Sequence, residues 1–167
     1  PYWLNSLLGM HLFPTLLVYF AFAPMALVLI LHPEMQPPLG IWDIVGQALA
    51  LGAVTIQLLS DEQLRKYRCT PEYKNGGAFR GGLWNYSRHP NYFGEVLFWI
   101  SGLFFALGSG LFQAHAMLIL AGPVAMALFF RYSAYLTDKR SLERRPGYAI
   151  IMKEVSALVP WPKSASN

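Results

Sequence analysis

Long apolar runs alternate with short polar stretches along this chain. Four of the runs are long enough for a helix that crosses a bilayer, since a crossing takes about 20 apolar residues. They cover about residues 10–31, 39–59, 96–112 and 116–136. Because a backbone in hydrocarbon must satisfy its own hydrogen bonds, each run is predicted to be a helix. The pattern therefore predicts an all-α fold, a polytopic transmembrane helical bundle with at least four spans.

After the fourth span, apolar and charged positions alternate with a helical period. Apolar side chains recur between residues 142 and 155, Lys, Arg and Glu surround them, and Pro146-Gly147 interrupts the pattern. We expect two short amphipathic helices at this C-terminal end. They either lie on anionic lipid headgroups or contribute to a ligand site, and the pattern by itself leaves both open.

The Lys and Arg residues fall into two clusters. The first Lys or Arg is Arg65, the first cluster ends at Arg88, and the second begins at Arg131. Short loops rich in Lys and Arg stay on the cytoplasmic side of a membrane. Two spans separate the clusters, so both lie on one side. We therefore expect the 60–93 loop and the C-terminus to be cytoplasmic.

Composition supports lipid as the solvent of this chain. Of its 167 residues 54% are hydrophobic and 13% are charged, a balance that is unusual for a soluble domain. The net charge of +4 does not indicate nucleic acid, because the basic residues are separated by apolar runs. The chain begins with Pro1 and not with Met. We expect a single transmembrane domain, 1–167, that is the C-terminal part of a longer chain.

The segment 81–99 combines several kinds of reactive side chain at the approach to the third span. Pro is favoured in a first helical turn, so this helix is predicted to begin near Pro90. Asn91 and Glu95 then share one face of the helix, with Tyr92 beside them. A carboxylate within a membrane is a candidate functional group, although Glu95 could instead only pair neighbouring helices.

A second polar group ends the second span. Asp61, Arg65 and Arg68 lie at helical spacing on one face, and an Arg fork suits phosphate. Each cation alone could simply extend toward headgroups. Together with the Arg88-His89 turn and the basic tail, however, they share one membrane face. This convergence predicts a clamp for an anionic, partly aromatic ligand, toward which His89 acts as a hydrogen-bond donor or as an acid–base group, the donor role being favoured.

Other site classes find little support in the sequence. The four His residues are scattered, and no Cys or His pair has the spacing of metal ligands, so no metal site is predicted. Glycine fingerprints of dinucleotide folds, P-loops and serine elbows are lacking as well. A nucleotide cofactor is therefore expected in a membrane-embedded pocket.

Residues 82–95 read GLWNYSRHPNYFGE. This stretch resembles the steroid 5-alpha-reductase-like family of bacterial membrane proteins and, more distantly, sterol reductases and isoprenylcysteine carboxyl methyltransferases. The likeness extends to residues 11–16, 61–64 and 142–148. It implies a multi-span helical fold whose C-terminal half holds a cofactor on the cytoplasmic side, here of the bacterial inner membrane.

The resemblance implies one of two cofactors, NADPH in the reductases or S-adenosylmethionine in the methyltransferases. The Arg-His-Pro core is common to both branches. Asn91, Tyr92, Gly94 and Glu95 look like the reductase version of the motif, and Asp61 with the two following Arg residues matches reductase contacts to cofactor. This favours an NADPH-dependent reductase of a conjugated carbon–carbon double bond in a sterol-like or other lipidic substrate. A methyltransferase and a non-enzymatic lipid-binding protein are the alternatives.

The expected cofactor contacts come from both basic clusters and from the segment between them. Arg side chains would neutralise phosphates, Asp61 and Asn91 would bond ribose or amide groups, and aromatic rings would form the walls. The full set is Asp61, Arg65, Arg68, Trp84, Tyr86, Arg88, His89, Asn91, Tyr92, Glu95, Arg131, Tyr135 and Asp138. The family's His-rich approach to its last helix is replaced here by residues 131–135, RYSAY. Catalytic residues that polarise the substrate are expected in earlier spans, which this chain lacks.

Overall fold

The fold is known from a computed structural model, which describes residues 3, 7–31, 38–145 and 147–162. The chain divides into two compact units. One comprises residues 1–50 and 96–128, and the other comprises residues 51–95 and 129–167. The expectation of one transmembrane domain stays a prediction.

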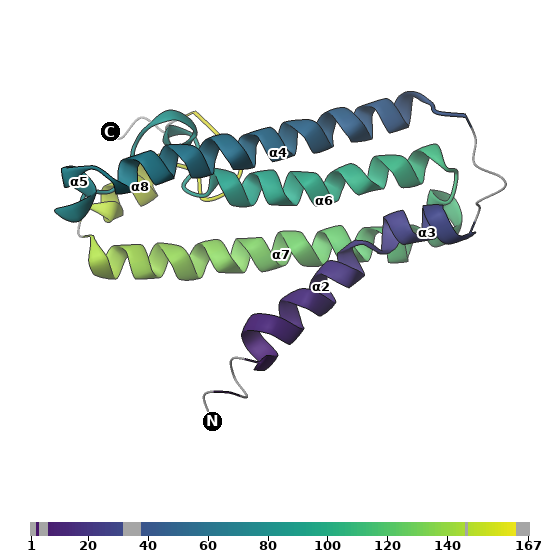
Figure 1. Cartoon of the computed structure of the whole chain (residues 1–167), viewed down its shortest axis with the longest axis horizontal. Coiled ribbons are helices and arrows are strands. Elements are labelled where there is room, and N and C mark those ends of the chain that lie inside the picture. Colours follow the sequence, from purple (N-terminus) through teal and green to yellow (C-terminus); the bar gives the residue numbers. More distant parts are fainter. Residues whose placement is uncertain (1–2, 4–6, 32–37, 146, 163–167) are drawn as a thin grey trace. The chain divides into compact units, whose positions relative to one another are not determined.

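Three long helices dominate the described residues, α4 (Ile41–Arg68), α6 (Pro90–Gly108) and α7 (Phe112–Arg144) (Figure 1). Each is long and apolar enough to cross a membrane, which confirms the second, third and fourth predicted spans and indicates an integral membrane protein. The described residues contain no β-strand, only one isolated bridge between Ser87 and Ser156. The fold is therefore all-α, as predicted.

The first predicted span is helical but interrupted. It consists of a π-helical turn (Leu7–Leu12), α2 (Phe13–Ala21) and α3 (Ala23–Leu31). The interruption at Phe22 precedes Pro24, which has no N–H to donate to the preceding turn. None of these pieces alone has the length of a span, so a fourth crossing stays a prediction.

The first unit has a small apolar core of its own. Ala106, Leu111 and Ile119 are buried there, with Leu27 and Leu103 packed against them. The chain reverses after α6 at Gly110, whose positive φ of 74° suits glycine. A tight turn thus joins α6 to α7.

The second unit carries three short helices, α5 (Pro71–Lys74), a 3₁₀ turn (Gly82–Asn85) and α8 (Tyr148–Glu154). Side chains attach the 3₁₀ turn to the end of α4. The indole Nε1 of Trp84 donates to the carbonyl of Ser60 at 3.0 Å, and the backbone N of Leu83 donates to Gln63 Oε1 at 3.0 Å. The polar segment between the second and third spans is thereby held against α4.

The C-terminal end differs in part from the prediction. Two short helices were expected around Pro146-Gly147, but α7 continues without a break to Arg144, so only α8 is separate; Pro146 lies outside the described residues. The physical reason is that four polar residues near this end of α7, Thr137, Arg140, Ser141 and Arg144, share one helical face and line a cavity. Tyr148 and Ile151 of α8, and Val155 directly after it, are buried in an apolar cluster.

After α8 the chain runs along the segment that precedes α6. The backbone N of Arg88 donates to the carbonyl of Ser156 at 2.8 Å, and Ser87 Oγ donates to the carbonyl of Leu158 at 2.7 Å. The backbone N of Trp161 donates to the carbonyl of Tyr86 at 2.9 Å. We call residues 155–161 the C-terminal strap, since these bonds attach it to the start of α6.

Candidate functional site

The second unit contains a cavity of about 350 Å³, within the size range of small-molecule sites. The ends of α4 and α7, the start of α6, α5, α8 and the loop before α6 all contribute to its wall. The lining residues are Leu64, Arg68, Tyr73, Phe79, Trp84, Arg88, His89, Asn91, Tyr92, Thr137, Arg140, Ser141, Arg144, Arg145, Tyr148 and Ile151. This set contains five Arg residues and no carboxylate.

Most of these Arg side chains are available to a ligand. Arg68, Arg140 and Arg144 make no hydrogen bond or ion pair with any residue that the structure describes. Arg145 lies over the ring of Tyr73, with its guanidinium carbon 4.7 Å from the ring centroid. Guanidinium groups form strong, charge-assisted hydrogen bonds to phosphates and carboxylates. The cavity is therefore suited to an anion.

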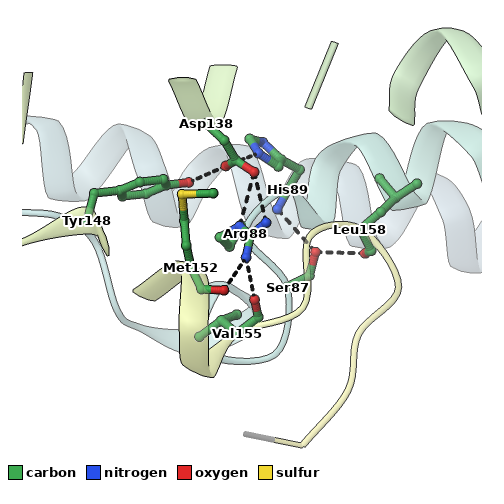
Figure 2. A network of polar contacts seen from close by, with 8 residues as sticks. All are labelled: Ser87, Arg88, His89, Asp138, Tyr148, Met152, Val155 and Leu158. Carbon is green, nitrogen blue, oxygen red and sulfur yellow. Dashed lines mark hydrogen bonds and ion pairs between the residues drawn. The ribbon is translucent and has the colours of Figure 1, made fainter. Parts of the chain in front are cut away.

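Arg88 differs from the other four because the protein itself uses its charge (Figure 2). Its Nε and Nη2 donate to Asp138 Oδ2 at 3.2 and 2.9 Å. Its Nη1 donates to the carbonyls of Met152 and Val155 at 2.9 and 2.7 Å, at the C-terminal end of α8. All three nitrogens are thus engaged within the protein. Arg88 thereby links α8 to α7, and the phosphate contact expected from the sequence stays a prediction.

Asp138 is the centre of this network. It is 3% exposed, and its Oδ1 contacts His89 Nε2 at 2.8 Å and accepts from the Tyr148 hydroxyl at 2.7 Å. Figure 2 shows these groups and Arg88 converging on one carboxylate. Burial raises the pKa of Tyr148 above its ordinary value, and the hydrogen bond to Asp138 raises that pKa further.

Flat aromatic faces form other parts of the wall. The rings of His89 and Tyr92 are stacked, with centroids 5.2 Å apart and planes 11° from parallel. Phe79 and Trp84 lie on the wall with centroids 6.2 Å apart, and the Trp84 indole is held in place by its bond to Ser60. Such faces can stack on a planar ring of a ligand.

Asn91 carries an acceptor that the described residues leave unsatisfied. Its Nδ2 donates to Asp61 Oδ1 at 3.2 Å, whereas its Oδ1 is buried without a hydrogen-bond partner. An unpaired buried acceptor costs about 1–3 kcal/mol. A ligand N–H or O–H that reached Asn91 would remove this cost.

A second hollow adjoins the cavity. It is lined by Leu58, Leu59, Asp61, Glu62, Leu64, Arg65, Arg68 and Asn91, so Leu64, Arg68 and Asn91 face both spaces. Arg65 is engaged there in an exposed pair with Glu62, at 2.6 and 2.8 Å. Within the described parts of the chain, no group of three His, Cys, Asp or Glu residues could hold a metal ion.

The structure brings together nine of the thirteen site residues expected from the sequence. Six line the cavity, namely Arg68, Trp84, Arg88, His89, Asn91 and Tyr92. Asp61 and Arg65 line the second hollow, and Asp138 lies directly behind the cavity wall. Tyr86, Arg131 and Tyr135 are exposed, Glu95 is partly buried on α6, and none of these four lines either space. Cofactor contacts for all thirteen stay predictions.

Several lining residues were not expected. Thr137, Arg140, Ser141 and Arg144 lie at spacings of three and four, on one face of α7. That spacing is visible in the sequence, but Arg140 and Arg144 were expected only on the polar side of the amphipathic C-terminal end, and no role was expected for Thr137 and Ser141. Tyr73 and Phe79 have no comparable signal, because only the folded loop brings them to the wall.

Comparisons with known proteins identify the family of this chain. The family model described as "Protein of unknown function (DUF1295)" matches residues 2–155. An uncharacterized protein of Schizosaccharomyces pombe is 27% identical over 181 residues, which covers 96% of this chain and 51% of the relative, so the chain spans about half of that protein. No solved structure matches the chain. The chain belongs to the DUF1295 family of proteins of unknown function.

Proposed function

We propose that this protein is part of an NADPH-dependent membrane reductase that reduces a conjugated carbon–carbon double bond in a sterol-like or other lipidic substrate. The observation that carries the proposal is a cavity with five Arg residues, aromatic walls and no lining carboxylate. A dinucleotide phosphate combines several negative charges with planar rings, and this lining complements both. The likeness of residues 82–95 to steroid 5-alpha-reductase-like proteins supports the same chemistry.

The charge of the lining favours NADPH over S-adenosylmethionine. The methyl donor carries a sulfonium and an ammonium cation against one carboxylate, so a site for it would be expected to offer carboxylates. None lines this cavity, and the nearest buried carboxylate, Asp138, is already paired with Arg88. Phosphates, in contrast, would find Arg68, Arg140 and Arg144 free of other partners.

The residues of the chain have distinct tasks in this proposal. Arg68, Arg140 and Arg144 bind phosphate groups. Asn91 accepts an N–H from the carboxamide, and the stacked His89 and Tyr92 rings support a planar ring. When bound, NADPH supplies a hydride to the β carbon of the substrate; the protein orients it and excludes water.

The same proposal places the cavity on the cytoplasmic face of a bacterial inner membrane. The Arg residues of the lining belong to the two basic clusters, which short-loop charge bias assigns to the cytoplasm. A soluble dinucleotide would reach the cavity from that side. A lipidic substrate would approach from the bilayer, where large apolar side chains of α4 such as Leu51 and Leu58 are exposed.

Binding measurements on the purified full-length protein in detergent test the proposal. We expect saturable NADPH binding that Arg140→Ala and Asn91→Ala each weaken about tenfold or more, because each removes one hydrogen-bonding group. Lys139→Ala is the matched control, since Lys139 is an exposed cation next to Arg140 that does not line the cavity. Binding of S-adenosylmethionine alone would favour a methyltransferase. Binding of neither compound would leave a lipid-binding protein.

A further inference from the structure

Asp138 does not line the cavity but contacts residues that do. Its side chain is 5% exposed and is not part of the lining, yet three lining residues, Arg88, His89 and Tyr148, contact its two oxygens. These three come from the start of α6 and from α8, while Asp138 belongs to α7. A change at this carboxylate would therefore reach the ligand only through other side chains.

The contacts define where the protons lie. An ionised carboxylate only accepts hydrogen bonds, and the ion pair with Arg88 at 2.9 Å stabilises the ionised form of Asp138. The Tyr148 hydroxyl must then donate to Oδ1, and His89 must carry a proton on Nε2 to bond the same oxygen at 2.8 Å. A neutral imidazole with a proton on Nε2 has an unprotonated Nδ1.

The remaining nitrogen of His89 faces no competing partner. Its Nδ1 forms no hydrogen bond with any residue in the described part of the chain, and the ring lines the cavity. The ring is held by its stack on Tyr92 and by the contact of Nε2 with Asp138, and the backbone N of His89 donates to Ser87 Oγ at 3.1 Å. His89 is thus held in both position and orientation.

We propose that Asp138 is a positioning residue that holds His89 in the tautomer whose Nδ1 accepts a hydrogen bond from an N–H or O–H of the ligand. This replaces the donor role expected for His89 from the sequence. The Asp138 carboxylate performs a second task at the same time, since it neutralises Arg88 and so leaves the anion-binding charge of the cavity to the other four Arg residues. The ligand part of the inference rests on the proposed NADPH site.

Nitrogen NMR of ¹⁵N-histidine-labelled protein tests the tautomer without any ligand. At pH 8 we expect a protonated Nε2 and an unprotonated Nδ1 for His89, because Nε2 donates to the Asp138 carboxylate. The His89→Gln variant assigns its signals. A wild-type His89 with the proton on Nδ1 overturns the inference directly, even if no Asp138 variant folds.

The Asp138→Asn variant should reverse the tautomer. Arg88 retains the amide oxygen, so the amide N–H₂ faces His89 Nε2 and moves the ring proton to Nδ1. Asp43→Asn is the matched control, because it makes the same chemical change in the other unit and should leave the His89 signals unchanged. Unchanged signals in Asp138→Asn would show that Asp138 does not select the tautomer.

NADPH titration then tests the link to the ligand. We expect NADPH to shift the Nδ1 signal of the wild-type protein and Asp138→Asn to bind NADPH on the order of tenfold more weakly, the loss of about one hydrogen bond. Equal affinity despite a reversed tautomer overturns the acceptor role of His89. If the wild-type protein binds no NADPH, the proposed function fails instead, while the ligand-free spectra still decide the role of Asp138.

Discussion

At the scale of a single residue, Arg88 shows how burial changes the energetic role of a charged side chain. Its side chain and that of Asp138 are 9% and 5% exposed. A buried ion pair contributes little net stability compared with a well-packed apolar pair. Removal of one partner, however, leaves the other charge buried without a counter-ion. The pair is thus a strong constraint on structure even where its net contribution to stability is small.

We predict that Asp138→Ala lowers the free energy of unfolding by about 3–5 kcal/mol, because it leaves Arg88 buried without its counter-ion. The Arg88→Met/Asp138→Leu double variant should recover much of that loss. Chemical unfolding in detergent measures both. Arg65→Ala is the control, since the pair of Arg65 with Glu62 is exposed and its removal should scarcely move the transition. Equal losses from the two pairs would contradict the prediction.

Tyr148 gives a prediction on pH. Its pKa in the folded protein is raised above the ordinary value of 10.0, first by burial and then by Asp138. A raised folded pKa means that the stability gained from this group is complete below pH 10 and is lost as the pH rises beyond it. We expect the unfolding free energy of the wild-type protein to fall more steeply above pH 10 than that of Tyr148→Phe. Parallel curves would show that the pKa of Tyr148 is not raised in the folded protein.

At the scale of elements, close backbone contact between α4 and α6 positions Asn91 beside Asp61. Gly94 makes this contact possible, because a Cβ there would lie 2.8 Å from Gln57 Cγ and 2.9 Å from the carbonyl of Ala53. The 3.2 Å bond from Asn91 to Asp61 lies less than one helical turn away along α6.

We predict that Gly94→Ala destabilises the protein by about 1–3 kcal/mol, since the extra methyl group forces the two helices apart, and that it also weakens NADPH binding through Asn91. The control is Gly102→Ala on the same helix, where a Cβ would meet nothing within 4 Å. Thermal unfolding and NADPH titration of both variants test this. Equal behaviour of the two alanine variants would argue against close packing at Gly94.

At the scale of the whole molecule, the two basic clusters provide a test of orientation. Cys69 is the chain's one cysteine and is exposed within the first cluster, so it can report which side of the membrane this segment faces. The turn between α6 and α7 is separated from it by one predicted span, so a probe there should report the opposite side.

We predict that a membrane-impermeant maleimide labels Cys69 in inverted membrane vesicles but not in intact cells, because Lys- and Arg-rich loops stay in the cytoplasm. In a Cys69→Ser background, Gln113→Cys should show the reverse pattern, since Gln113 is exposed at the start of α7. Labelling of both positions from one side would refute the assignment of α6 as a span.

The sequence by itself determined the membrane class, the three long helices and six of the residues that line the cavity. Apolar runs of spanning length permit only a helix in hydrocarbon, and side chains spaced three and four residues apart, such as Asp61, Arg65 and Arg68, share a helical face by geometry alone. Local spacing is sufficient for predictions of this kind.

Tertiary structure alone decided which of those side chains face a ligand and which serve the fold. Arg88 and Asp138 are 50 residues apart, and their bond depends on how the end of α7 meets the start of α6. The same is true of Tyr148, which was expected on an apolar stripe and instead donates to Asp138. Burial and pairing depend on neighbours distant in sequence, and no periodicity in a single chain encodes them.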